Sequence, residues 1–160
     1  MPRARANGIE IEWEGKGPAD APAILLVAGL GGQMTRWTDA FTDALVAHGF
    51  RTIRFDNRDS GLSTKLDAGD QPYALDHMAD DAVAVLDAAG VARAHVVGAS
   101  LGGAVAQLVA IEYSDRVLTL TSIMSSTGNP ALPRATPAAQ AALIARPDVT
   151  DPDALVAHGV

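Results

Sequence analysis

The sequence predicts an α/β fold: a mostly parallel sheet of about six strands with helices on both faces. Two observations predict it. Apolar runs of strand length alternate along the chain with segments of helical spacing. In addition, residues 21–29 are a continuous apolar run, which is typical of a strand buried on both faces of a parallel sheet. Strand–helix–strand units of this kind have right-handed connections, which cover both faces of the sheet with helices.

An antiparallel hairpin is expected before this sheet. Asn7-Gly8 stands between two short alternating runs, and Asn-Gly is a strong signal for a type I′ turn. After the apolar run, Thr38 is expected to cap a helix that Gly49 ends. The remaining elements follow in chain order, with helices at 37–49, 73–90 and 100–113 and strands at 50–55, 94–98 and 116–125.

The composition changes after the last expected strand. Residues 125–160 hold five prolines, and twice a cap residue precedes a proline at the start of a short expected helix, at Thr136-Pro137 and at Asp151-Pro152. The pattern predicts two regions. Residues 1–123 form an α/β core, and residues 124–160 form the beginning of a helical cap.

The overall composition limits the possible partners. The 160 residues are 48% apolar and 19% charged, as in a globular protein. A net charge of −7 and a pI of about 4.8 argue against nucleic acid or an anionic membrane as a partner. The absence of cysteine excludes disulfides and thiolate zinc sites. No segment has the apolar core of a signal peptide or the length of a membrane span, so the expected location is the cytoplasm.

Ser100 is the candidate nucleophile. It stands in the stretch GASLG, where the strand at 94–98 meets the next helix. This G-x-S-x-G pattern between a strand and a helix predicts a nucleophile elbow, a tight turn that strains the serine backbone and exposes its hydroxyl. Gly98 and Gly102 remove side chains that would collide at the turn, and Gly103 lets the helix pack closely on the sheet. The alternative is a serine that caps an ordinary helix.

Four segments together resemble the α/β-hydrolase superfamily, above all its small cytoplasmic esterases, among them methylesterases that act on polyketide antibiotics. In chain order they are LLVAGLGG at 25–32, FDNRDSGLS at 55–63, VVGASLGG at 96–103 and DRVLTLTSI at 115–123. The resemblance implies a serine hydrolase of carboxylic esters that forms an acyl-serine at Ser100. It also implies an oxyanion hole built from the backbone N–H groups of Leu30 and Leu101.

Asp56 and Arg58 belong to a polar loop that fits the D-x-R-x-x-G-x-S pattern of the same superfamily. We expect the two side chains to hold this loop beside the site. They are not expected to be catalysts, since a paired carboxylate has a lowered pKa and is a poor base. A solvated polar turn is the alternative.

No metal or cofactor site is predicted. The stretch GLGGQM at 29–34 lacks the third glycine of a dinucleotide fingerprint and the Lys-Ser/Thr of a phosphate loop. Asp59 and the pair Asp80-Asp81 have no further ligands at metal-binding spacing.

The acid and the base of a catalytic triad have no good candidates. In this superfamily both follow the serine along the chain. His158 is the only histidine after Ser100, and it lies close to the end of the chain. His95 precedes Ser100 by five residues on the same strand, so at about 3.3 Å per residue it lies well over 10 Å from the tip. The other candidates are expected to have structural roles: His48, His77, Asp115, Asp148, Asp151 and Asp153.

The chain is therefore expected to be the N-terminal portion of an esterase-like hydrolase that acts on a small ester or a related acyl compound. The nucleophile and the oxyanion hole are present in it, and the acid and the base are absent. A perhydrolase or a carbon–carbon-bond hydrolase would also keep the serine. A catalytically inactive fold fragment, acting as a binding or interaction module, is a further alternative.

The sixth strand, Val117–Ser122, is expected to be an unpaired apolar edge. Such an edge favours pairing with another chain, so we expect self-association or marginal stability.

Overall fold

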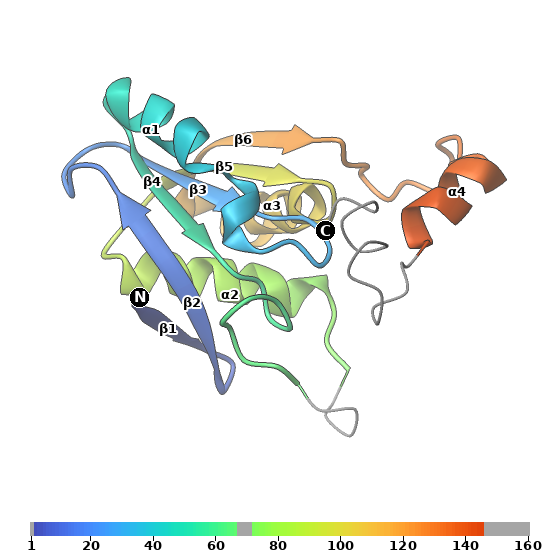
Figure 1. The fold of residues 1–160 in the computed structure, drawn as a ribbon, viewed down its shortest axis with the longest axis horizontal. Coiled ribbons are helices and arrows are strands. Elements are labelled where there is room, and N and C mark those ends of the chain that lie inside the picture. Colours follow the sequence, from blue (N-terminus) through green and yellow to red (C-terminus); the bar gives the residue numbers. More distant parts are fainter. Residues whose placement is uncertain (1, 67–71, 146–160) are drawn as a thin grey trace, which may run out of the picture. The chain divides into compact units, whose positions relative to one another are not determined.

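Figure 1 shows the computed structural model, which describes residues 2–66 and 72–145. Its central feature is a six-stranded sheet with the strand order β1-β2-β4-β3-β5-β6. The strands are β1 (Arg3–Ala6), β2 (Ile9–Lys16), β3 (Ala23–Val27), β4 (Arg51–Phe55), β5 (Ala94–Ala99) and β6 (Val117–Ile123). The helices are α1 (Asp39–Ala47), α2 (Leu75–Ala88), α3 (Leu101–Glu112) and α4 (Pro137–Ile144), with 3₁₀ turns η1 (Met34–Arg36) and η2 (Ser114–Arg116). The predicted fold class is confirmed.

The strand pairing is parallel at the centre of the sheet and antiparallel at its start. β3 pairs in parallel with β4 and with β5, and β5 pairs in parallel with β6. β2 is antiparallel to both β1 and β4. Asn7 and Gly8 have φ angles of 47° and 81°, and a type I′ turn requires positive φ at both central residues. The predicted N-terminal hairpin is therefore confirmed.

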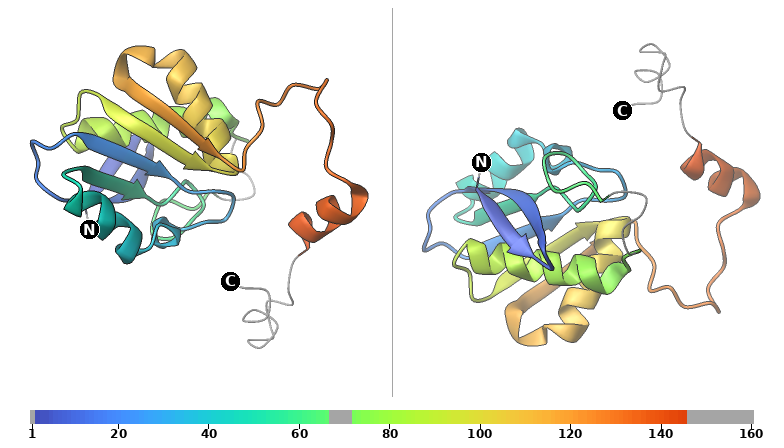
Figure 2. Two further views of the ribbon diagram at one scale, coloured as in Figure 1. Left: turned by 90° about the horizontal axis from the view of Figure 1, so that it is seen from above. Right: turned by 90° about the horizontal axis from the view of Figure 1, so that it is seen from below.

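Helices cover both faces of this sheet, with α1 on one face and α2 and α3 on the other (Figure 2). All five residues of β3 are buried, as its continuous apolar sequence predicts. Helix α2 buries a stripe of residues that includes Met78, Ala82 and Leu86. The parallel strands β3, β4 and β5 have their carboxyl ends at the same end of the sheet. Open α/β sheets bind their ligands at this end.

The compact unit that holds the sheet ends at Thr127, and a second unit begins at Gly128. Within the second unit, Thr136 caps α4 by accepting a hydrogen bond from the N–H of Ala139 at 3.2 Å. The cap over residues 124–160 stays a prediction, and Asp151-Pro152 lies outside the described residues. In the described part of the chain, no helix is both long enough and apolar enough to cross a membrane.

Among the described residues, β6 lies at the edge of the sheet and pairs with β5. Leu118, Leu120 and Ile123 on this strand are 40%, 41% and 37% exposed. An edge strand presents a row of N–H and C=O groups that can pair with another strand, and exposed apolar side chains strengthen such pairing.

We predict that the chain self-associates through β6 and that a lysine on this strand prevents it. Thr121→Lys places a charge on the exposed edge, and edge charges oppose strand-to-strand association. The control Ala47→Lys adds the same charge at an exposed position of α1. Sedimentation velocity at several protein concentrations should show association of the wild type and of the control but not of Thr121→Lys. A wild type that stays monomeric throughout would contradict the prediction.

Candidate active site

Ser100 occupies a strained turn between β5 and α3. Its φ and ψ angles are 55° and −121°, a region that residues with a Cβ rarely adopt and that costs about 1–3 kcal/mol. Hydrogen bonds fix the turn on both sides. The N–H of Ser100 donates to the carbonyl of Ile123 on β6 at 2.8 Å, and its own carbonyl accepts from the N–H of Gly103 at 2.9 Å. The residue is exposed and its side chain makes no capping hydrogen bond to α3, unlike the serine of an ordinary helix cap.

The three glycines around Ser100 are positions where a side chain has no room. A Cβ on Gly98 would lie 2.0 Å from the carbonyl oxygen of Gly102, and a Cβ on Gly102 would lie 2.2 Å from that of Val27. A Cβ on Gly103 would lie 2.5 Å from the Cβ of Ser125. Backbone atoms cannot move aside as the end of a side chain can. The close approach of β3, β5 and α3 therefore depends on Gly98 and Gly102.

The two backbone N–H groups expected to bind an oxyanion belong to the residue after Ser100 and to the glycine turn that passes beside Ser100. Leu101 is the first residue of α3, so its N–H has no partner within the helix. Leu30 lies in a turn after β3, which the N–H of Gly32 closes by donating to the carbonyl of Gly29 at 3.0 Å. A Cβ placed on Gly29 would lie 3.9 Å from the Oγ of Ser100, so this turn passes directly beside the hydroxyl. No described residue accepts a hydrogen bond from the N–H of Leu30 or Leu101.

Asp56 ties two loops of the site together. One of its carboxylate oxygens accepts a hydrogen bond from the N–H of Met34 at 2.7 Å, and the other accepts from the N–H of Leu62 at 2.8 Å. The next residue, Asn57, donates to the carbonyl of Ala28 at 2.9 Å. Both side chains are buried. Two of these hydrogen bonds, from Met34 to Asp56 and from Asn57 to Ala28, join the loop after β4 to the segment that follows β3, and the bond from Leu62 closes the loop on itself.

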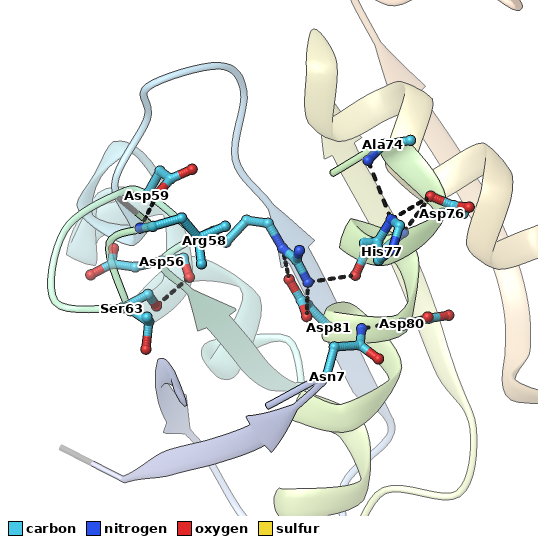
Figure 3. Close-up of polar contacts among 12 residues, drawn as sticks. Asn7, Asp56, Arg58, Asp59, Ser63, Ala74, Asp76, His77, Asp80 and Asp81 are labelled. Carbon is cyan, nitrogen blue, oxygen red and sulfur yellow. Dashed lines mark hydrogen bonds and ion pairs between the residues drawn. The ribbon is translucent and has the colours of Figure 1, made fainter. Parts of the chain in front are cut away.

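Arg58 holds the same loop to helix α2, and Figure 3 shows its guanidinium beside Asp81. Its Nε and Nη2 donate to the two oxygens of Asp81 at 2.7 and 2.8 Å, and Nη2 also donates to the carbonyl of His77 at 3.2 Å. The partner of Arg58 is therefore Asp81, and the carboxylate of Asp56 accepts from backbone N–H groups. The sequence signal for this partner is an acidic residue on the otherwise apolar core stripe of α2.

Burial and pairing act against each other in this ion pair, whose side chains are 4% and 2% exposed. Burial raises the pKa of the Asp81 carboxyl, and the hydrogen bonds from Arg58 oppose that rise. Burial acts to lower the pKa of Arg58, but the hydrogen bonds and charge of Asp81 raise it above its ordinary value. The ring of Tyr73 stacks against the guanidinium, with its centroid 4.9 Å from the Arg58 Cζ.

The histidines among the described residues have partners away from Ser100. His48 bonds to a backbone carbonyl of its own helix at 2.7 Å, and His77 lies 2.9 Å from the carboxylate of Asp76. His95 bonds to a hydroxyl on β6 at 2.8 Å. Asp115 lies in η2, before β6 begins and so at the opposite end of the strands from Ser100. The remaining candidates lie outside the described residues: Asp148, Asp151, Asp153 and His158.

A pocket of about 150 Å³ lies beside the glycine turn. It is bounded by the turn after β3, by the loop after β4 and by the first residue of α3. Its lining residues are Gly29, Leu30, Gly31, Asn57, Arg58, Asp59, Ser60, Tyr73, Met78 and Leu101. Within residues 2–66 and 72–145, no three His, Cys, Asp or Glu side chains form a group that could hold a metal ion.

We predict that Gly102→Ala destabilises the chain much more than Gly90→Ala. Gly102 has backbone oxygens where its Cβ would lie, so we expect a loss of at least about 3 kcal/mol of unfolding free energy. Gly90 has a φ of 68° and open space around it, so the expected loss is about 1 kcal/mol from backbone conformation alone. Urea unfolding followed by circular dichroism measures both. Equal losses in the two variants would contradict the close packing described for the elbow.

A second prediction concerns the buried ion pair. Arg58→Met leaves the Asp81 carboxylate buried without its cation, which we expect to cost about 3–5 kcal/mol of stability. The double variant Arg58→Met/Asp81→Leu removes both charges and should recover most of that loss, because an apolar pair needs no desolvation of charge. Urea unfolding of both variants and of Asp81→Leu completes the cycle. Strictly additive losses would show that the two side chains do not act as a pair.

Comparison with known proteins assigns the family. The family described as the alpha/beta hydrolase fold matches residues 22–150. The rhodomycin D methylesterase DnrP of Streptomyces peucetius is 48% identical over 127 residues, which are 78% of this chain and 42% of that protein. A hydrolase from Pseudomonas aeruginosa PA01 has a TM-score of 0.71 and 32% identity over 90% of this chain and 52% of its own. The enol-lactonase of Burkholderia xenovorans LB400 has a TM-score of 0.64 and 30% identity over 72% of this chain and 44% of its own.

The chain spans less than half the length of the methylesterase that it matches. The family match covers most of the 160 residues, and it includes the glycine turn, the loop after β4 and the Ser100 elbow. The chain belongs to the α/β-hydrolase family.

Proposed function

We propose that the chain carries the nucleophile and the oxyanion donors of a serine hydrolase that acts on carboxylic esters. The strained and exposed turn at Ser100 is the observation that carries the proposal. A helix cap or a solvated turn needs no such backbone, whereas a nucleophile gains from a hydroxyl held above the sheet. The identity to a protein named as a methylesterase supports an ester as the substrate.

In the proposed reaction, the Oγ of Ser100 attacks the ester carbonyl carbon and gives its proton to a base. The carbonyl oxygen becomes an oxyanion, and the backbone N–H groups of Leu30 and Leu101 donate hydrogen bonds to it. The bond to the alcohol oxygen then breaks, and the alcohol leaves with the proton. Water attacks the acyl-serine in the same way and releases the carboxylic acid.

The described residues do not supply the acid and the base that this reaction needs. The partners of His48, His77 and His95 are all distinct from Ser100. Without a base, oxyanion donors alone give a residual rate enhancement on the order of 10³ over water. Slow acylation and slower release are therefore expected of residues 1–160 unless a further segment or chain provides an Asp and a His.

Because the triad is incomplete, two alternative functions are also compatible with Ser100. A perhydrolase or a carbon–carbon-bond hydrolase would use the same nucleophile and oxyanion donors. A binding module of the same fold would keep the turn without using its hydroxyl. The serine itself disfavours relatives whose elbow nucleophile is a carboxylate.

A fluorophosphonate probe tests the nucleophile. We expect slow labelling of the folded chain at Ser100, located by peptide mass spectrometry, and its loss in Ser100→Ala. The control Ser114→Ala removes an exposed hydroxyl from η2 and should label like the wild type. Labelling that persists in Ser100→Ala, or a folded wild type that does not label above an unfolded control, would refute the nucleophile and favour the binding module.

A further inference from the structure

Three largely buried residues line the pocket beside the glycine turn and hold polar atoms that bond to no other described residue. Asn57 and Arg58 line it and are only 4% and 5% exposed. Asn57 uses its Nδ2 to donate to Ala28, and Arg58 uses Nε and Nη2 for Asp81 and His77. Among the described residues, nothing bonds to the Oδ1 of Asn57 or to the Nη1 of Arg58.

A third polar group lies in the same pocket. Ser60 lines it and is 9% exposed. Its backbone N–H donates to the carbonyl of Asn57 at 3.0 Å, but its hydroxyl has no partner in the described part of the chain. Solvent reaches these atoms, because the fully buried side-chain atoms without a partner in the described part of the chain belong to Trp13, Trp37 and Arg54. A ligand that enters this small pocket can therefore pair with these groups in place of water.

The charges around the pocket indicate the kind of group that fits. Arg58 is paired with Asp81, and Asp59 adds a carboxylate to the lining. The pocket thus has no excess positive charge for an anion. The Nη1 of Arg58 is a cationic donor, which disfavours an ammonium group. A neutral hydroxyl fits best, because it can accept from the Nη1 of Arg58 and donate to the Oδ1 of Asn57.

The pocket adjoins the proposed reaction centre. Leu30 and Leu101 line it, and their backbone N–H groups are the proposed oxyanion donors. Its volume is about 150 Å³. A substituent of a few non-hydrogen atoms can therefore occupy it while the ester carbonyl lies at Ser100.

We propose that this pocket binds a hydroxyl group of the substrate through Asn57, Arg58 and Ser60, so that the preferred esters are hydroxylated close to the ester bond. This inference extends the proposed function, and it rests on that function because the ester carbonyl must lie at Ser100. The hydroxyl can belong to the acyl part or to the alcohol part of the ester, and the chemistry of recognition is the same.

The test measures binding to Ser100→Ala, so that no reaction is required. Nuclear magnetic resonance titration gives the dissociation constants of two matched pairs: methyl 3-hydroxybutanoate with methyl butanoate, and 3-hydroxypropyl acetate with propyl acetate. We expect the hydroxylated member of one pair to bind about tenfold more tightly, as one or two hydrogen bonds would provide. The pair that shows the preference identifies the part of the ester that carries the hydroxyl. Equal affinities within both pairs would overturn the proposal.

Variants then assign the preference to this pocket. In the Ser100→Ala background, we expect Asn57→Ala to leave less than a twofold preference for the hydroxylated ester. Ser60→Ala should lower the preference by a factor of about three. Ser114→Ala is the matched control and should leave it unchanged. Asn57→Ala also loses the hydrogen bond to Ala28, so the folding of this variant is checked by its amide spectrum. If Asn57→Ala unfolds, Ser60→Ala alone tests the site. A preference that survives in folded Ser60→Ala and Asn57→Ala would refute the site.

The two hypotheses can fail separately. If the folded wild type is not labelled by the fluorophosphonate, the nucleophile is refuted, but the preference for hydroxylated esters in binding can still be observed. If the matched esters bind with equal affinity, the hydroxyl-binding pocket is refuted, but labelling of Ser100 can still be observed.

Discussion

The site depends on how closely three backbone segments approach one another at the carboxyl end of the sheet. β3, β5 and α3 meet where Gly98 and Gly102 leave no space for a Cβ, with backbone oxygens as near as 2.0 Å to its position. This approach forces Ser100 into a positive φ and sets its hydroxyl beside the glycine turn. The hydrogen bond from Ser100 to Ile123 on β6 anchors the turn on its outer side. The strain of the serine is thus imposed by the packing of the central strands.

Much of this arrangement could be predicted from the sequence because its signals are local. Asn7-Gly8 determines a turn through its own φ angles, and the apolar run after Pro22 has the character of a strand buried on both faces. The glycine spacing around Ser100 likewise reflects a conflict between atoms a few residues apart. In each case the physical cause lies within one short segment.

The features that the sequence did not reveal depend on contacts between distant segments. Nothing local to Arg58 indicates that its partner is Asp81, 23 residues away on α2. An acidic residue on the apolar stripe of α2 is a signal for a buried pair, but it does not identify the cation. The small polar pocket has the same origin, since its lining comes from the turn after β3, the loop after β4, α2 and α3.

The carboxylate of Asp56 also has a mechanical consequence. It holds the N–H of Met34 with one oxygen and the N–H of Leu62 with the other, and Asn57 adds a tie to Ala28. Two hydrogen bonds therefore join the segment that carries Leu30 to the loop that carries Arg58. We therefore expect a ligand that displaces the loop to move the amide of Leu30 with it.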